Sequence, residues 1–257
     1  MNDPLRAKPV GKPNFFLLGA GRCGTTTLHS MLRQHPGIFM SAVKEPSFFC
    51  SYFQVVKNPV SYFELFDPRQ GETAIGEASH VYLSNPESAA VIRQLFPEAR
   101  FILIFRNPAE RAHSLYQFCR AAKFEALQTF EQAIDAEEHR FADAEFFRNC
   151  PQYFWNFMYL RSSCYDVQWR RYLDLYPRSN FFPLSLHEFR SEPMLWMRRI
   201  YEFLGVDPDF SPALERLNSV SYPPMRADTR ERLDKYFEQV IDQTQLLAGR
   251  DMGLRLA

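Results

Sequence analysis

A glycine-rich segment near the amino terminus contains residue types that bind phosphate. The sequence Gly19-Ala20-Gly21-Arg22-Cys23-Gly24-Thr25-Thr26-Thr27 follows a short apolar run and precedes a stretch with helical spacing. In such a position, free backbone N–H groups and the positive end of the helix converge on an anion. We therefore predict a phosphate-binding loop formed by Arg22, Cys23, Gly24, Thr25, Thr26 and Thr27.

This loop fits two nucleotide-binding patterns. It contains the GxGxxG of dinucleotide folds and the GxxxxG of nucleoside triphosphatases, but Thr25 stands where the triphosphatase pattern has lysine. Arg22 is the fixed cation of the loop, placed to meet a phosphate and a leaving oxygen. Cys23 has no recognisable base paired with it, so we interpret it as a small filler and not as a nucleophile.

A second candidate phosphate site follows a strongly apolar run. Arg106 comes directly after Phe101–Phe105, and Ser114 lies eight residues later in a predicted helix. Open α/β sheets bind ligands at the carboxyl ends of their strands. A guanidinium fork and a hydroxyl at this place would clamp a separate phosphate, such as the 3' phosphate of an adenosine nucleotide.

Alternating strands and helices are expected to position both motifs. The run Phe101–Phe105 is apolar on both faces, as a strand between two helical layers must be. Asn85-Pro86 and Asn107-Pro108 are typical of helix starts. Strands are predicted at 14–18, 73–76, 101–105 and 180–184, and helices at 25–34, 86–95, 108–122, 127–139, 158–175, 193–204 and 228–247. The predicted fold is a single α/β domain with a central parallel sheet flanked by helices and a P-loop-like nucleotide site.

Composition limits the possible functions. Residues 1–257 are expected to form one domain, with 1–13 as a flexible amino-terminal segment. Thirty Lys and Arg residues balance thirty Asp and Glu residues, which argues against a surface for nucleic acid or membranes. No stretch approaches the roughly 18 apolar residues of a membrane span. Five widely spaced cysteines without a CxxC pair predict reduced thiols and no zinc site. We expect a cytoplasmic protein.

Together the two phosphate motifs resemble those of the sulfotransferases that use 3'-phosphoadenosine-5'-phosphosulfate (PAPS), in particular the branch with the heparan sulfate sulfotransferases and bacterial relatives. Gly21–Leu28 corresponds to the 5'-phosphosulfate loop and Phe105–Ser114 to the 3'-phosphate motif. The family usually has lysine where this chain has Arg22, which keeps the charge but widens the donor group. The resemblance implies sulfuryl transfer from PAPS without a metal, with adenosine 3',5'-bisphosphate (PAP) as product and a small molecule, lipid or glycan as acceptor.

The resemblance also implies catalytic residues. Lys44-Glu45-Pro46-Ser47-Phe48-Phe49 is similar to the family segment with a catalytic glutamate three residues before two phenylalanines, which makes Glu45 the general base and Arg22 the cation at the leaving oxygen. Gly76–Tyr82 resembles the segment that lines the acceptor cleft, without a lysine common there in glycan-modifying members. His80 in this segment is a second base, an acceptor contact or a structural imidazole.

Two further segments resemble nucleotide-contacting parts of the family. Tyr165 corresponds to a position near the adenosine, with core packing as the alternative interpretation. Tyr222–Arg226 corresponds to the loop that closes over the nucleotide.

Other readings of the same residues stay open. Glu45 also lies about 20 residues beyond the glycine loop, where a dinucleotide fold places its ribose-binding carboxylate, although a nicotinamide enzyme does not need Arg106 and Ser114. A small-molecule or nucleotide kinase would need Mg²⁺ and ATP, but the loop lysine and a clear magnesium carboxylate are missing. An inactive nucleotide-binding regulatory protein is the third possibility. The acceptor and the oligomeric state stay open.

Overall fold

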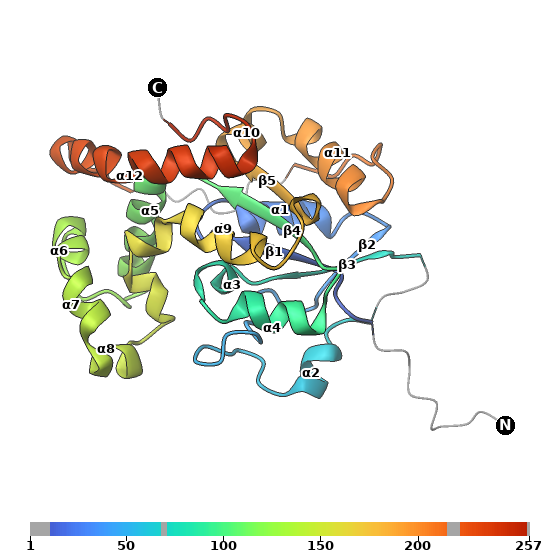
Figure 1. Ribbon diagram of the computed structural model, residues 1–257, viewed down its shortest axis with the longest axis horizontal. Coiled ribbons are helices and arrows are strands. Elements are labelled where there is room, and N and C mark those ends of the chain that lie inside the picture. Colours follow the sequence, from blue (N-terminus) through green and yellow to red (C-terminus); the bar gives the residue numbers. More distant parts are fainter. Residues whose placement is uncertain (1–10, 68–70, 215–221, 256–257) are drawn as a thin grey trace.

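One parallel sheet organises the protein. The computed structural model describes residues 11–67, 71–214 and 222–255. Its five strands lie in the order β2-β3-β1-β4-β5 and all neighbours are parallel. The strands are β1 (Phe15–Gly19), β2 (Ile38–Met40), β3 (Ala74–Ala78), β4 (Arg100–Phe105) and β5 (Phe181–Ser185). Helices lie on both faces of the sheet (Figure 1), so the predicted α/β fold is confirmed.

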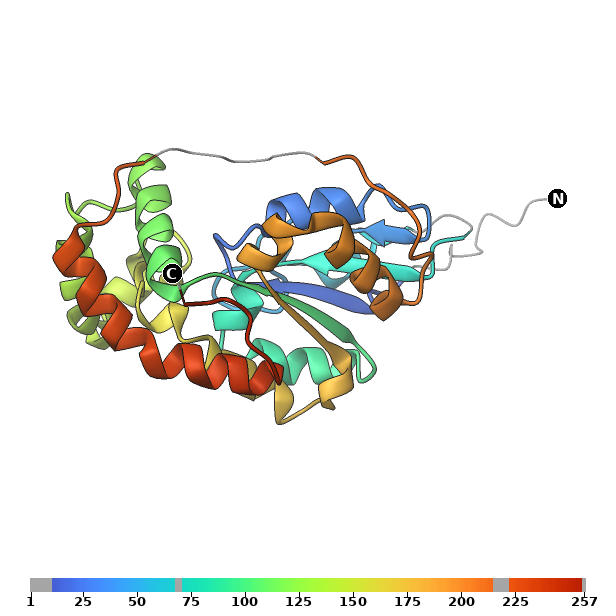
Figure 2. The same ribbon diagram turned by 90° about the horizontal axis from the view of Figure 1, so that it is seen from above.

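Helices form two covering layers and an end cap. They are α1 (Thr25–Leu32), α2 (Pro59–Phe63), α3 (Val81–Ser84), α4 (Ser88–Leu95), α5 (Pro108–Ala121), α6 (Phe130–Asp135), α7 (Glu137–Ala142), α8 (Ala144–Asn149), α9 (Tyr165–Leu173), α10 (Leu186–Ser191), α11 (Pro193–Leu204) and α12 (Ala227–Ala248). Figure 2 shows α1, α10 and α11 on one face of the sheet and α3 and α4 on the other. Helices α5 to α8 lie beyond the carboxyl ends of the strands, at the left in Figure 1.

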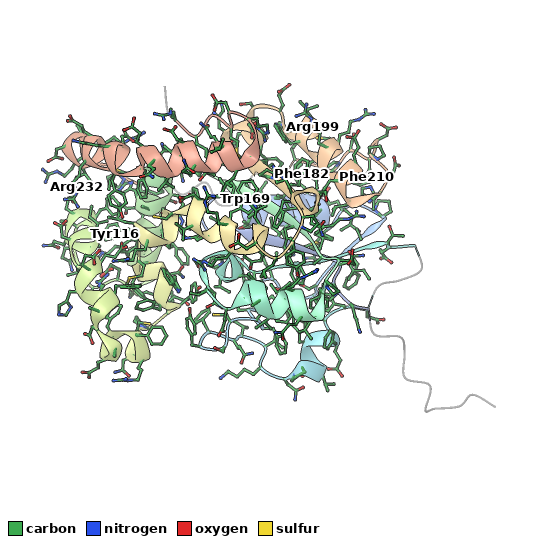
Figure 3. All side chains as sticks on the ribbon, in the orientation of Figure 1. Tyr116, Trp169, Phe182, Arg199, Phe210 and Arg232 are labelled. Carbon is green, nitrogen blue, oxygen red and sulfur yellow. The ribbon has the colours of Figure 1, made fainter. Side chains whose placement is uncertain are left out.

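The core is built from aromatic side chains of the central strands. β1 is buried along its whole length and β4 from Phe101 onward, as expected of strands with helices on both faces. Phe16, Phe101 and Phe181 stack across β1, β4 and β5, with neighbouring ring centroids 6.0 and 5.2 Å apart. Trp169 of α9, labelled near the middle of the molecule in Figure 3, packs on Phe181 of this row and on Phe105, with ring centroids 6.2 and 5.7 Å away. This packing fixes the carboxyl ends of β1 and β4 relative to each other.

Local sequence signals located some helices accurately. α11 spans the predicted residues 193–204. Asn107 caps α5 as expected, because its side chain accepts a hydrogen bond from the Glu110 N–H group. By contrast, Asn85 does not cap a helix at Pro86: its side chain donates to Phe49 O and Ser88 Oγ, and α4 begins at Ser88.

Two other helix predictions need correction. The helix expected at 127–139 consists of α6 and α7, and the helix expected at 158–175 begins only at Tyr165, after a 3-10 turn at Arg161–Ser163. The short elements β2, α3, α8 and α10 were not predicted, since three to six residues carry little periodicity. Residues 1–10 of the expected flexible segment lie outside the described residues, whereas Gly11 N–H donates to Phe66 O at 2.9 Å.

Within the described ranges, no helix is both long enough and apolar enough to cross a bilayer.

Candidate active site

The carboxyl ends of three neighbouring strands bring the predicted site residues together. β1 lies between β3 and β4. The chain leaves β1 through α1 on one face of the sheet and passes from β3 to β4 through α3 and α4 on the other, which creates the crevice where open α/β sheets bind ligands. The glycine loop follows β1, His80 follows β3 and Arg106 follows β4. The topology therefore accounts for the proximity of motifs that lie far apart in the sequence.

The glycine loop presents an open helix start. Gly24 occupies the N-cap position of α1 with φ 93°, and no side chain caps the helix. The first-turn N–H groups of α1 therefore lack a side-chain acceptor and can bind an anion. Thr25 is buried, while Thr26 and Thr27 are partly exposed beside it. This geometry fits the predicted phosphate-binding role.

Two glycines of the loop are required by close packing. A Cβ atom at Gly21 would stand 2.7 Å from His80 Cδ2, and one at Gly24 would stand 2.8 Å from Leu186 Cδ1. Both distances are too short for real carbon contacts. The glycines thus let His80 and α10 lie directly against the loop.

Arg22 connects the two phosphate motifs. Its Nε donates a long hydrogen bond of 3.4 Å to Ser114 Oγ, and its guanidinium lies 5.0 Å from the centre of the Phe118 ring on the same helix, α5. Burial lowers the pKa of Arg22 from its ordinary value, with a further contribution from Arg106. Its hydrogen-bond acceptor is neutral, so this cation is available to an anionic ligand.

Arg106 lies at the edge of a cavity. Arg106 Nη2 donates to Glu110 Oε2 at 2.8 Å, and Glu110 Oε1 accepts from Arg230 Nη1 of α12, also at 2.8 Å. Burial alone would lower the pKa of Arg106, but Tyr222 and Glu110 raise it above its ordinary value. The cavity measures about 420 Å³ and is lined by Arg106, Asn107, Glu110, Ser185, Leu186, His187, Arg190, Ser191, Gly253 and Leu254. Ser114 is buried beside Arg22.

Glu45 is held by a dense set of donors. Its backbone has φ 61°, and its N–H donates to Ala78 O at 2.9 Å. Glu45 Oε2 accepts from both the N–H and the Nδ1 of His80, each at 2.8 Å, while Oε1 pairs with Lys44 Nζ. Burial would raise the pKa of Glu45, but His80 and Lys44 lower it to about 2. The carboxylate is therefore ionised at neutral pH.

The structure places Cys23 and Tyr165 behind the loop. Both side chains are fully buried, and Cys23 Sγ lies 3.8 Å from the Tyr165 hydroxyl oxygen. Burial raises the pKa of the Cys23 thiol, which suits a packing residue. The Tyr165 ring packs on Phe105, with centroids 4.8 Å apart. A direct contact of Tyr165 with a nucleotide stays a prediction.

Sequence reasoning missed a buried carboxylate that supports the Glu45 segment. Glu77 in β3 accepts hydrogen bonds from the hydroxyls of Tyr62 at 2.6 Å and Ser79 at 2.5 Å. Ser79 Oγ in turn accepts from the Ser47 N–H at 3.0 Å, two residues after Glu45. Burial raises the pKa of Glu77 to about 7, against the effect of its hydroxyl donors. An acidic residue inside an apolar strand was the available signal.

A buried arginine beneath the loop was also missed. Arg111 on α5 is 3% exposed, and its Nε donates to Gly21 O at 3.1 Å. Its place in the second phosphate motif, five residues after Arg106, did not by itself reveal a contact with the first motif.

Comparisons with known proteins agree with this geometry. A family model described as "Sulfotransferase domain" matches residues 12–247. The crystal structure of a sulfotransferase from Alicyclobacillus acidocaldarius is 31% identical and superimposes with a TM-score of 0.83, covering 95% of this chain and 98% of that chain. A mouse sulfotransferase, SULT7A1, complexed with PAP is 13% identical with a TM-score of 0.51, covering 91% and 85% of the two chains, which shows a likeness of fold.

A human relative is known under a glycan-modifying name. The bifunctional heparan sulfate N-deacetylase/N-sulfotransferase 2 is 28% identical over 209 residues, which cover 76% of this chain and 22% of that protein. The chain spans between 22% and 28% of the length of the first four curated relatives that it matches. Since the family match extends over nearly all described residues and the bacterial structure aligns end to end, the chain belongs to the sulfotransferase family.

Proposed function

We propose that this protein transfers the sulfuryl group of PAPS to a hydroxyl or amine acceptor and leaves PAP as the second product. The observation that carries this proposal is the junction of Arg22 with Ser114, which brings the glycine loop and the second phosphate motif into one site. A nucleotide with phosphates at both its 5' and 3' positions has the two separated anionic groups that such a site would bind.

The residues present fit the donor. The uncapped start of α1 and Arg22 offer N–H and guanidinium donors to a 5' phosphate, and Arg106 with Ser114 offers donors to a 3' phosphate. The 420 Å³ cavity beside Arg106 is within the size range of small-molecule sites. It extends to Leu186, whose side chain also covers Gly24 of the loop. The cavity therefore lies beside Arg106 of the second phosphate motif, and through Leu186 it borders the residue that packs next to the glycine loop.

When bound, PAPS would supply an activated sulfuryl group and a phosphate leaving group. Glu45 would accept the proton of the attacking hydroxyl or amine as the new bond to sulfur forms. Arg22 and the N–H groups of α1 would stabilise the negative charge that the phosphate gains as its bond to sulfur breaks. The proton thus ends on Glu45, and the negative charge ends on the phosphate of PAP, where Arg22 and the N–H groups of α1 would stabilise it.

The contacts of Glu45 refine its proposed role. A carboxylate with a pKa of about 2 is ionised but weakly basic while His80 and Lys44 both hold it. Proton transfer to Glu45 therefore requires the Lys44 contact at Oε1 to give way to the acceptor, while His80 continues to orient Oε2. His80 Nδ1 donates to Glu45, as in carboxylate–imidazole pairs, so His80 Nε2 is the second candidate base.

Two substitutions separate these roles. If Glu45 is the base, Glu45→Gln should lower turnover by about 10²–10⁴-fold, whereas His80→Asn, which retains the backbone N–H bond to Glu45, should cost far less. An equal loss in both variants would assign the proton transfer to the Glu45–His80 pair and not to Glu45 alone.

The acceptor and the cellular location are proposed from the matched relatives and from the cysteines. We propose a small molecule, lipid or glycan as acceptor; the glycan option is supported by several matched relatives that carry heparan sulfate in their names. The five cysteines lie in the described part of the chain as free thiols, as is usual in the reducing cytoplasm, and we place the protein there.

Donor binding is tested by calorimetric titration with PAP, ATP and NAD in the absence of magnesium. The proposal predicts binding of PAP in preference to the other two nucleotides. A preference for ATP would favour a kinase, and a preference for NAD would favour a dinucleotide enzyme; either result would refute the donor assignment.

A further inference from the structure

Arg111 is a buried cation with neutral partners. It is 3% exposed, and Nε donates to Gly21 O at 3.1 Å. Nη1 donates to the hydroxyls of Ser162 and Ser163 at 2.5 and 3.1 Å. Each of these hydrogen-bond acceptors is uncharged, so the hydrogen bonds satisfy donors of the guanidinium without neutralising its charge.

A buried guanidinium bonded only to uncharged acceptors lowers the stability of the folded protein unless another group supplies a negative charge. A buried charge without an opposite charge loses its hydration with no Coulombic return. The same chain handles another buried arginine differently: Arg140, 8% exposed, forms two hydrogen bonds of 2.7 and 2.8 Å to the Glu125 carboxylate. Arg111 is therefore unlike the structural arginine of this fold and resembles a cation that a ligand neutralises.

The contact with Gly21 shows where that ligand would bind. In a planar trans peptide the C=O and the following N–H point in opposite directions. Because Arg111 holds the Gly21 carbonyl, the N–H of Arg22 in the same peptide is directed away from Arg111, toward the other side of the loop. The charge of Arg111 thus lies behind the loop and adds to the positive potential of its N–H groups and of α1.

We propose that Arg111 is a positioning residue for the donor: it orients the glycine loop through the Gly21 carbonyl, and the 5' phosphate of the bound nucleotide balances its charge. This inference rests on the proposed function, because it names the 5' phosphate of an adenosine nucleotide as the counter-ion. It assigns Arg111 to the 5' end of the ligand, although the residue belongs to the motif that binds the 3' end.

The test compares Arg111→Met and Arg111→Lys by titration with three ligands: adenosine 5'-monophosphate, adenosine 3'-monophosphate and PAP. Methionine removes the charge at similar length, and the two ligands with a 5' phosphate should bind roughly 10- to 100-fold more weakly. Adenosine 3'-monophosphate should change by less than about threefold, since its charge lies farther from the loop. Lysine restores the charge without the planar fork and should recover part of the loss.

Arg140→Met is the matched control, because it removes a buried arginine away from the loop. It is expected to lower the melting temperature and leave the ratio of 5'- to 3'-monophosphate affinity at the wild-type value. Equal weakening of all three ligands by Arg111→Met would show a purely structural role and overturn the inference, as would unchanged affinities.

The ligand-affinity test remains possible if the Arg111→Met variant does not fold. If Arg111→Met is insoluble, Arg111→Lys still carries the prediction, with about three- to tenfold weaker binding of the 5'-phosphate ligands and an unchanged 3'-monophosphate; unchanged ratios would overturn it. Failure of the wild-type protein to bind PAP would instead refute the proposed function and this inference with it.

Discussion

Gly21→Ala should loosen the contact between His80 and the proposed base, Glu45, and so raise the pKa of Glu45. Gly21 does not have a positive φ, so alanine is compatible with its backbone. The new Cβ would stand 2.7 Å from His80 Cδ2, whereas ordinary carbon contacts begin at 3.4 Å. The imidazole must therefore retreat by roughly 0.7 Å if the loop holds its place. The loop is held by Arg111 on its other side, which makes movement of His80 the expected response.

This displacement is large enough to break the contact between His80 and Glu45. If the ring moves away from Glu45 by this amount, the distance from His80 Nδ1 to Glu45 Oε2 grows from 2.8 Å to about 3.5 Å, outside the usual range of a hydrogen bond. A hydrogen bond to a charged group contributes about 1.5–3 kcal/mol, and about 1.4 kcal/mol corresponds to one pH unit. The pKa of Glu45, about 2 in the wild type, should therefore rise to roughly 3–4.

Carboxyl ¹³C NMR titration of Glu45 measures this pKa directly. Gly37→Ala is the matched control, because its Cβ would meet the His35 ring at 3.2 Å, away from Glu45. The control should leave the Glu45 titration unchanged. If Gly21→Ala also leaves it unchanged while the protein stays folded, the loop and the base are not coupled through His80, and the reasoning is wrong.

Three further predictions concern charged groups of the site. Arg106→Ala should weaken PAP by roughly 10- to 100-fold and leave adenosine 5'-monophosphate nearly unaffected, as calorimetry can show, because only the 3' phosphate loses its guanidinium. Arg22→Lys removes the Nε donor to Ser114 and the stacking on Phe118, so PAP affinity and transfer rate should both fall several-fold in the same titration and in a turnover assay. Burial raises the pKa of Glu77 to about 7. Protonated Glu77 therefore contributes fully to the free energy of unfolding below its ordinary pKa of 4.5, and this contribution is lost as the pH rises through about 7. Chemical denaturation should show that this loss between pH 5 and 8 is smaller in Glu77→Gln; an equal loss in both proteins would contradict a raised pKa.

Local motifs made part of the site predictable. The glycine loop, Arg106 and the Asn107 cap each depend on residues within a few positions of one another and on a strand that precedes them. For this reason their placement at the carboxyl ends of β1 and β4 could be expected from the sequence, and the structure confirms it.

Local sequence patterns could not predict contacts between residues that lie far apart in the chain. The sequence suggested both Glu45 and His80, but not that one holds the other across 35 positions. Arg111 lies 90 positions from Gly21, and the Arg106–Glu110 pair reaches Arg230, 120 positions from Glu110. These contacts depend on the strand order and on the packing of α5 and α12, which a single sequence without aligned relatives does not specify.

The most direct measurement of the central claim is an acceptor-dependent transfer assay. The protein is incubated with PAPS and a panel of alcohols, amines, lipids and glycans, and mass spectrometry follows PAP and the sulfated product together. The account predicts equal amounts of both products with the wild-type protein, and a turnover about 10²–10⁴-fold lower with Glu45→Gln. Phosphorylated product from ATP and Mg²⁺, or sulfated product formed equally fast by Glu45→Gln, would contradict it.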